Sequence, residues 1–259
     1  MVEVDPEWWR RIFDEIYLVT DARSVCDHEL TCQEVDFLEH ALSLDKSWPI
    51  LDLCGGQGRH SLELSRRGFT DVTVLDYSDF LINLGKRRAE EESLGTLFIQ
   101  GDARDTCLPD HKYKIVMIMA SSFGYFQSEE ENKKLLHESF RLLRPGGILL
   151  LDLPNLDFVI KSFSPRSWHE ADNDIVVCRQ RRLDKEILTC REVVISKKKG
   201  LIRDEGYCTR LYSEVKISGM LREAGFNLTD VRKDFVSHEK YDDYGCMTNR
   251  MVVIACKGQ

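Results

Sequence analysis

The amino-acid sequence predicts an α/β protein with a doubly wound, seven-stranded, mostly parallel sheet and an antiparallel β insert after the fifth strand. Short apolar runs alternate five times with amphipathic helical segments, which is typical of consecutive parallel βα units. Near residue 165 this rhythm ends, and short segments with period-two alternation follow. The change of period indicates antiparallel strands inserted into the larger domain.

Length and charge narrow the class of protein. A chain of 259 residues with 42% hydrophobic residues can form one large domain with an elaborated insert. The net charge of -8 argues against nucleic acid as the main partner, because phosphate-binding surfaces need clustered cations. No stretch is long and apolar enough to span a bilayer, and the N-terminus lacks a signal-like pattern. We therefore expect a soluble, cytoplasmic protein that is not bound to a membrane.

The nine cysteines are scattered, without a Cys-x-x-Cys pair or a nearby set of histidine ligands. This pattern predicts no metal site. It is more typical of small buried thiols in a reducing compartment.

The N-terminal region is predicted to be helical. Residues 7–19 carry aromatic and aliphatic side chains at helical spacing, which predicts one amphipathic helix. Such a helix either covers the edge of the core or forms a lid over a ligand site, with Tyr17 pointing inward. Residues 20–30 are predicted to be a polar loop. Thr31 and Glu34 have the spacing of a capping box, so we expect a second helix to start at Thr31.

A strand, a glycine turn and a helix follow, and this stretch predicts a binding site for a nucleotide-type cofactor. Ile50–Leu53 is the expected buried strand, and three glycines lie between Gly55 and Gly58. Glycines let a ligand approach bare backbone, and the start of a helix offers unpaired N–H groups. Asp52 is a costly carboxylate inside a strand unless it binds something. On the helix, Arg59 is expected to face outward.

Acidic residues follow the next two predicted strands. Val72–Leu75 is followed by Asp76, about 20 positions after the glycine turn, where a carboxylate suits a ribose diol. Tyr77 then precedes a helix. Leu97–Gln100 is followed by Asp102, which could bind an adenine amino group or cap a turn.

The fourth and fifth strands are expected at Lys114–Met119 and Ile148–Asp152, with a helix over 129–143 between them. Ligands of such sheets bind at the carboxyl ends of the strands. The polar residues expected at that edge are Asp52, Asp76, Asp102, Ser121 and Asn155.

Three regions result from this pattern. Residues 1–47 would form an N-terminal helical lid, and residues 165–212 the antiparallel insert, with strands near 175–178, 188–195 and 207–212. Residues 48–164 and 213–259 would form the main domain, closed by strands near 227–235 and 250–255.

Four segments in order resemble the class I, Rossmann-like S-adenosylmethionine-dependent methyltransferases. They are Leu51–Gly58, Val74–Asp76, Gly101–Ala103 and Leu143–Gly147. Each motif is weak alone, but their order and spacing over residues 48–155 are specific. Leu153–Asn155 followed by Arg166–His169 is similar to small-molecule members with a β insert. The resemblance implies the cofactor S-adenosyl-L-methionine, with S-adenosyl-L-homocysteine as product.

The resemblance also implies a set of cofactor-binding residues. Asp76 would hold the ribose, Asp102 and Ala103 the adenine, and Asp52 would lie near the cofactor amino group. The full set is Asp52, Cys54, Gly56, Gly58, Arg59, Asp76, Tyr77, Asp102, Ala103, Ala120 and Ser121.

Cys54 stands where the family usually has glycine. Cysteine would be strained at positive φ, and we expect Gly55 to absorb that geometry.

Methyl transfer requires in-line alignment of the acceptor and, where needed, removal of an acceptor proton. His169 is the first candidate base, and Tyr17 and Tyr125 are others. His60, at the helix start, fits a structural or cofactor-side role better than catalysis. The expected acceptor is a small molecule with an N, O or S nucleophile, and the insert is a candidate homodimer interface.

Alternative functions remain open. A nicotinamide oxidoreductase would need Gly-x-Gly-x-x-Gly, but Ser61 occupies the third glycine position. A nucleic-acid amino methyltransferase would show Asn/Asp-Pro-Pro-aromatic where this chain has Ala120–Phe123. A protein methyltransferase or a non-catalytic S-adenosylmethionine-binding protein also fits the motifs.

Overall fold

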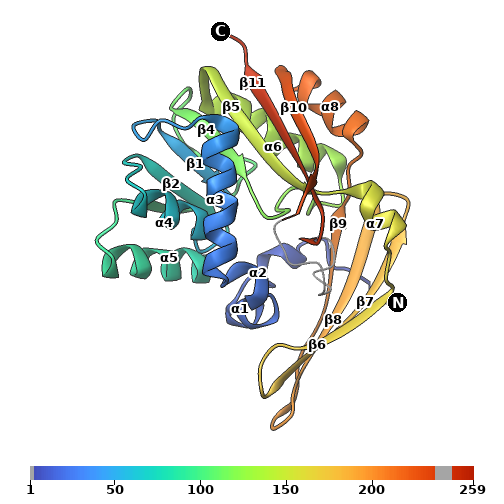
Figure 1. The fold of residues 1–259 in the computed structure, drawn as a ribbon. Helices are drawn as coiled ribbons and strands as arrows, with labels where there is room; N and C mark the ends of the chain where they lie inside the picture. The colour runs from blue at the N-terminus through green and yellow to red at the C-terminus, as the bar shows by residue number, and fades with distance from the viewer. Residues whose placement is uncertain (1–2, 237–246) are drawn as a thin grey trace.

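Seven strands form the main sheet of the computed structural model, which describes residues 3–236 and 247–259 (Figure 1). The strand order is β10-β11-β5-β4-β1-β2-β3. Strands β1 to β5 are parallel, whereas β11 pairs antiparallel with both β5 and β10. The strands are β1 Ile50–Leu53, β2 Val72–Asp76, β3 Leu97–Gln100, β4 Tyr113–Ile118, β5 Leu143–Pro154, β10 Phe226–Phe235 and β11 Arg250–Lys257. The predicted seven-stranded, mostly parallel sheet is confirmed.

Helices cover both faces of this sheet. Val35 and Leu38 of α3 pack on one face, and Leu136 of α6 and Leu221 of α8 pack on the other. The helical elements are η1 Trp8–Arg10, α1 Glu15–Thr20, α2 Ala22–Val25, α3 His28–Leu42, α4 Arg59–Arg66, α5 Asp79–Glu91, α6 Glu129–Leu142, α7 Leu156–Lys161 and α8 Glu214–Glu223. Within the described ranges, none of these helices has the length and apolar character needed to cross a membrane.

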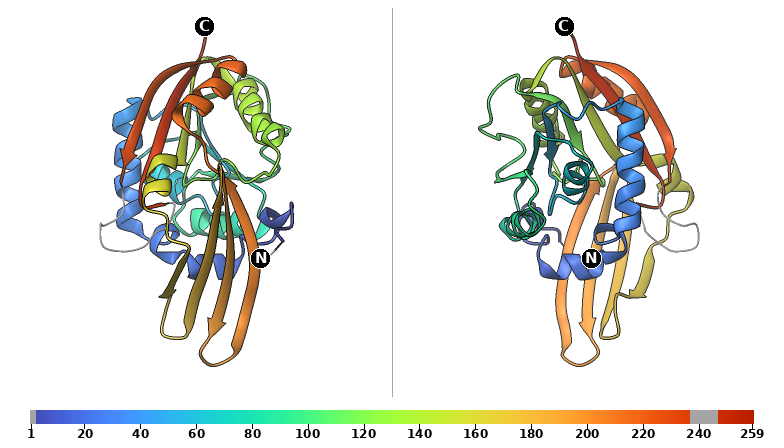
Figure 2. Two further views of the ribbon diagram at one scale, coloured as in Figure 1. Left: turned by 90° about the vertical axis from the view of Figure 1, so that its right-hand side faces the viewer. Right: turned by 60° about the vertical axis from the view of Figure 1, so that its left-hand side comes forward.

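The insert after β5 is an antiparallel sheet of four strands, as the sequence predicts in kind. Its strands, in spatial order, are β6 Arg166–Glu170, β7 Ile175–Asp184, β8 Ile187–Ser196 and β9 Gly200–Arg210. They are longer than predicted, and β6 is an additional strand. The insert projects beyond the edge at which β5 ends, beside the N-terminal helices (Figures 1 and 2).

The predicted continuous helix over residues 7–19 is wrong. A 3₁₀ turn at Trp8–Arg10 is separated from α1 by Asp14, whose Oδ1 accepts from the backbone N–H groups of Ile16 and Tyr17. Asp14 therefore starts a new helix where the apolar periodicity continues unbroken. The predicted loop over 20–30 also contains α2.

The predicted capping box at Thr31 is wrong as well. Helix α3 starts at His28, because Asp27 caps it by accepting from the Leu30 N–H at 3.0 Å. Thr31 lies inside the helix and donates to the Asp27 carbonyl oxygen at 2.7 Å. Glu34 is fully buried rather than turned back onto the helix start.

Buried ion pairs connect the closing strand to the helices. Arg250 of β11 is fully buried and donates to both Asp152 of β5 and Glu34 of α3. The other oxygen of Glu34, Oε2, lies 2.8 Å from Nε2 of His60 and 2.5 Å from Nη2 of Arg59. Arg59 is thus buried against α3, and the prediction that it faces outward is wrong.

Replacing Arg250 with methionine should destabilise the protein. The substitution removes the guanidinium partner of buried Asp152 and one of the two guanidinium partners of buried Glu34, which costs about 3–5 kcal/mol of unfolding free energy. Denaturant unfolding measures this loss. Arg191→Met is the control, because its ion pair with Asp204 lies on the surface, and it should change stability little. Equal effects of the two substitutions would contradict the structural importance of the buried pairs.

Candidate active site

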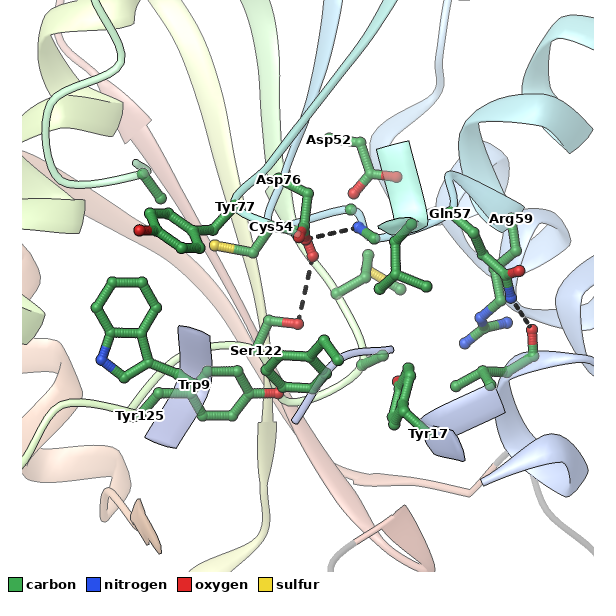
Figure 3. Close-up of a pocket in the computed structure, with 18 of the residues that line it drawn as sticks. Trp9, Tyr17, Asp52, Cys54, Gln57, Arg59, Asp76, Tyr77, Ser122 and Tyr125 are labelled. Carbon is green, nitrogen blue, oxygen red and sulfur yellow. Dashed lines mark hydrogen bonds between the residues drawn. The ribbon is translucent and has the colours of Figure 1, made fainter. Parts of the chain in front are cut away.

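A cavity lies at the carboxyl ends of β1 to β4, beneath the N-terminal residues, and is lined by most of the predicted cofactor residues (Figure 3). Those that line it are Asp52, Cys54, Gly56, Arg59, Asp76, Tyr77, Asp102, Ala103 and Ala120. Gly58 instead caps α4 at positive φ, and a Cβ there would lie 2.6 Å from the Phe98 ring. Ser121 lines a neighbouring cavity.

The glycine turn is built differently from the expectation. Cys54 itself adopts the left-handed conformation, with φ of 63°, and its N–H donates to the Leu75 carbonyl oxygen at 2.8 Å. Gly55 does not have positive φ, so it does not absorb that geometry. Glycine is required at position 55 for space, because a Cβ would lie 2.6 Å from Cγ of Asp52.

Asp52 presents a buried carboxylate to the cavity. Its Oδ2 accepts from the Ser61 hydroxyl at 2.8 Å, and its buried Oδ1 has no hydrogen-bond partner among the described residues. Burial raises the pKa of Asp52 to about 7, although Ser61 and Arg59 act in the opposite direction. A buried acceptor atom without a partner fits a ligand that brings an N–H group.

Asp76 holds the backbone of the cavity in place. Its Oδ2 accepts from Gly56 N at 2.8 Å, and its Oδ1 accepts from Ser78 N, also at 2.8 Å. One side chain thus joins the glycine turn after β1 to the start of α5. Burial raises the pKa of Asp76, while these backbone hydrogen bonds lower it.

Asp102 serves a turn and also faces the cavity. Its carboxylate accepts from the backbone N–H of Arg104 at 2.9 Å and forms a bidentate pair with the Arg104 guanidinium. Asp102 therefore has the predicted turn-capping role, and it also lines the cavity.

His60 contributes to the buried ion-pair cluster. It lines the cavity, but its Nε2 lies 2.8 Å from Glu34. Burial lowers the pKa of His60 to about 4, so the imidazole is neutral near pH 7. This environment fits the structural role better than proton transfer.

A second cavity adjoins the first. It extends between the N-terminal residues and the inner faces of β7, β8 and β9. The residues that line both cavities are Phe13, Tyr17, Val25, Arg59, Ala120 and Tyr125. The rings of Phe13 and Tyr125 are stacked with centroids 5.6 Å apart, and Phe13 meets Tyr17 edge-on at 5.1 Å. Aromatic walls and Ala120 therefore mark the boundary between the two spaces.

The three predicted catalytic residues differ in position. Tyr17 and Tyr125 line both cavities, but burial raises the pKa of each hydroxyl, which makes them poor proton acceptors near neutral pH. His169 lies on β6 with its Nε2 3.2 Å from the Thr20 carbonyl oxygen, and it is not among the described lining residues of either cavity.

The sequence reasoning missed the charged face of the insert. Arg179 of β7, Glu192 of β8 and Arg203 of β9 all line the second cavity. Glu192 alternates with apolar residues inside the predicted strand 188–195, and this alternation was the available signal. Arg179 and Arg203 lay outside the strands as they were predicted.

One side-chain cluster outside the cavities could hold a metal ion. Ligand atoms of His28, Cys32 and Glu63 lie within 4.8 Å of one another. The i, i+4 spacing of His28 and Cys32 on α3 was the missed signal. Glu63, however, already accepts from the side chains of Arg66 and Arg67.

Sequence comparisons identify a methyltransferase domain over residues 50–147. The protein YqeM of Bacillus subtilis is 27% identical over 201 residues, which cover 76% of this chain and 81% of YqeM. The C-methyltransferase UbiE of Roseobacter denitrificans, from ubiquinone/menaquinone biosynthesis, is 34% identical over 113 residues, covering 41% of this chain and 44% of UbiE. The chain thus spans less than half of UbiE.

Solved structures share the fold. An S-adenosylmethionine-dependent methyltransferase from Clostridium acetobutylicum superimposes with a TM-score of 0.75 at 16% identity, covering 94% of this chain and 97% of that one. The sugar N-methyltransferase KedS8 from Streptoalloteichus gives a TM-score of 0.66 at 15% identity, covering 100% and 97%. The matched methyltransferase domain and the strand order agree, and the chain has the class I fold of S-adenosylmethionine-dependent methyltransferases.

Proposed function

We propose that this methyltransferase transfers a methyl group to a small-molecule acceptor bound in the second cavity. The observation that carries the proposal is the shared boundary at Ala120, Tyr17 and Tyr125. A methyl donor in the first cavity can reach an acceptor in the second only across this boundary. The concave wall, with five aromatic side chains and several polar groups, favours a small acceptor over a polymer.

The first cavity supports a specific cofactor orientation. We place the ribose hydroxyls at Asp76, the adenine at Asp102 and Ala103, and the cofactor amino group at Oδ1 of Asp52. The Arg59 guanidinium is the cation available for the cofactor carboxylate. In this orientation the sulfonium, which supplies an electrophilic methyl group, lies toward Ala120.

The N-terminal residues, in this proposal, are a lid that excludes water and aligns the acceptor. Their support is a set of contacts to both sides of the site. Gln57 of the glycine turn donates to the Val25 carbonyl oxygen at 2.6 Å, and Ser78 donates to that of Phe13 at 2.6 Å. On the insert side, Arg179 pairs with Asp21 at 2.8 Å. Such a lid limits competing reaction with water and fixes in-line geometry.

Relatives differ in the atom they methylate. UbiE is described as a C-methyltransferase and KedS8 as a sugar N-methyltransferase. Both descriptions support a small-molecule acceptor for this chain, and by themselves they leave its N, O, S or C nucleophile undecided.

We also propose that the insert, residues 165–212, forms a homodimer interface and that the protein works in the cytoplasm. Trp168 on β6 is 70% exposed, which supports an association surface. Free thiols such as Cys54, Cys190 and Cys208 support a reducing compartment.

Asp76→Ala should weaken S-adenosylmethionine binding at least about tenfold, because the ribose loses a charged acceptor. Titration calorimetry measures the affinity. Asp79→Ala is the matched control, since Asp79 is an exposed acid on the same turn. Unchanged affinity in Asp76→Ala would count against the cofactor orientation.

Cofactor affinity should rise with pH between about 5.5 and 7.5. The pKa of Asp52 is raised to about 7, so the carboxylate gains charge across this range, while a free α-amino group stays mostly protonated below about 7.7. An ionised Asp52 binds an ammonium group more strongly. Asp52→Asn should abolish the rise in calorimetric titrations at several pH values. A rise that persists in Asp52→Asn would assign it to another group.

Blocking the second cavity should stop methyl transfer without affecting the cofactor. Thr209 of β9 lines the second cavity and does not line the first. Thr209→Trp should reduce acceptor turnover about 100-fold by displacing the acceptor. S-adenosylhomocysteine formation with a panel of amines, thiols and phenols measures turnover, and calorimetry measures cofactor affinity. Thr189→Trp is the control, because Thr189 lies on the opposite face of the insert. Equal turnover in both variants would place the acceptor elsewhere.

A further inference from the structure

A buried carboxylate stands on the inner face of the insert, in the wall of the second cavity. Glu192 lies in β8, a central strand, and is only 2% exposed. The inward-facing residues of β8 alternate as Leu188, Cys190, Glu192 and Val194, so Glu192 replaces an apolar side chain in a buried row. A carboxylate at such a position is costly unless it has partners or a task.

The two oxygens of Glu192 are engaged unequally. Oε2 accepts from Nε of Arg179 at 2.8 Å, and Nη2 of Arg179 lies at the same distance. Oε1 lies 3.8 Å from Nη1 of Arg203, which is beyond hydrogen-bond distance. Arg179 also pairs with Asp21, and Arg203 also pairs with Asp14. Three carboxylates thus share these two guanidinium groups, and Oε1 is the less engaged oxygen of Glu192.

The described wall of the second cavity offers few groups that can accept a proton near neutral pH. Its charged residues are Asp21, Glu192 and the arginines Arg59, Arg179, Arg181 and Arg203, and it includes neither lysine nor histidine among the described residues. Burial raises the pKa of the hydroxyls of Tyr17, Tyr125 and Tyr207, so these remain protonated. The candidates are the two carboxylates.

Glu192 is the better proton acceptor of the two. Asp21 is 32% exposed and accepts from both Thr20 and Arg179 through Oδ2. Burial raises the pKa of Glu192 from its ordinary value, which brings it closer to the working range of a general base. The charged and titratable groups that face Glu192 are Asp21 from the N-terminal residues, Arg179 and Arg181 from β7, Arg203, Glu205 and Tyr207 from β9, and Cys190 from its own strand.

We propose that the acceptor is an amine and that Glu192 takes the proton from its ammonium form. This inference rests on the proposed function. The Glu192 carboxylate accepts one proton from R–NH₃⁺, and the freed nitrogen lone pair forms a bond to the methyl carbon. The carbon–sulfur bond breaks with its electron pair staying on sulfur. The products are R–NH₂–CH₃⁺ and the neutral thioether, and the proton on Glu192 passes to solvent.

Three of the four arginines in the described cavity wall, Arg59, Arg179 and Arg203, are paired with carboxylates. The aromatic rings of the wall and Glu192 are the features that support a nitrogen acceptor. Methyl transfer moves positive charge from sulfur to nitrogen, and aromatic faces as well as a carboxylate stabilise such a cation. Five aromatic residues line the second cavity: Trp8, Phe13, Tyr17, Tyr125 and Tyr207. A carboxylate is a weak base for an alcohol, whose pKa lies far above that of an ammonium group.

The test uses the full-length protein with matched acceptors. Small ring-bearing and alkyl amines are each compared with the alcohol and the thiol of the same skeleton, with a deuterated methyl donor and mass detection of the product. Amines should be N-methylated, and Glu192→Gln should lower kcat about 100-fold or more. Wild-type kcat should fall as pH drops and Glu192 is protonated, and Glu192→Gln should lose this acid limb. Glu170→Gln is the control, because Glu170 lies on β6 with an exposed side chain and is not among the described lining residues of the cavity.

A second readout does not depend on activity. Glu192→Gln should weaken binding of the amine to the protein loaded with S-adenosylhomocysteine at least about fivefold, and leave binding of the matched alcohol unchanged. Glu192→Asp keeps the negative charge and should retain part of the wild-type rate. It is the variant to use if Glu192→Gln folds poorly.

Turnover of alcohols or thiols but not amines would overturn the amine assignment while leaving the proposed function intact. Failure of every amine both to react and to bind would also overturn it. Failure of the wild-type protein to bind S-adenosylmethionine, measured separately by calorimetry, would instead overturn the proposed function. A kcat in Glu192→Gln within about twofold of the wild type would remove Glu192 from catalysis.

Discussion

The fully buried pairing of Arg250 with Asp152 and Glu34 is the interaction on which the site depends most. It joins the last strand of the sheet to the fifth strand and to α3. Asp152 Oδ2 also accepts from the backbone N–H of Ala120 at 2.8 Å, and Ala120 has φ of 54°. Glu34 in turn holds Arg59 and His60 at the start of α4. One cluster of buried charges therefore fixes both the boundary residue Ala120 and one wall of the cofactor cavity.

The active site combines parts that are held in place in different ways. The strand ends and the glycine turn are held firmly, because Asp76 accepts from backbone N–H groups and the buried Asp52 accepts from Ser61. The N-terminal residues are held to both sides by hydrogen bonds and ion pairs, and also by the buried side chains of Trp8, Trp9 and Ile12. The cover over the two cavities is therefore part of the packed structure.

Sequence motifs predicted the seven-stranded, mostly parallel sheet and the positions of Asp52, Asp76 and Asp102 at its strand ends, because those features depend on local patterns along parallel strands. The helix over 7–19 failed because a local cap, Asp14, outweighs apolar periodicity. Arg59 looked solvent-exposed because its partner Glu34 belongs to another helix. The alternation within β8 marks Glu192 as inward-facing, but its surroundings come from three strands and from the N-terminal residues, which only tertiary structure brings together.

A crystal structure of the complex with S-adenosylhomocysteine would test the central claim most directly. The account predicts the ribose at Asp76, the amino group at Asp52 and the sulfur beside Ala120. The side of the sulfur that carries the methyl group in S-adenosylmethionine should face the second cavity. A sulfur atom turned away from Ala120, or a homocysteine moiety lying in the second cavity, would contradict the division of the site into cofactor and acceptor spaces.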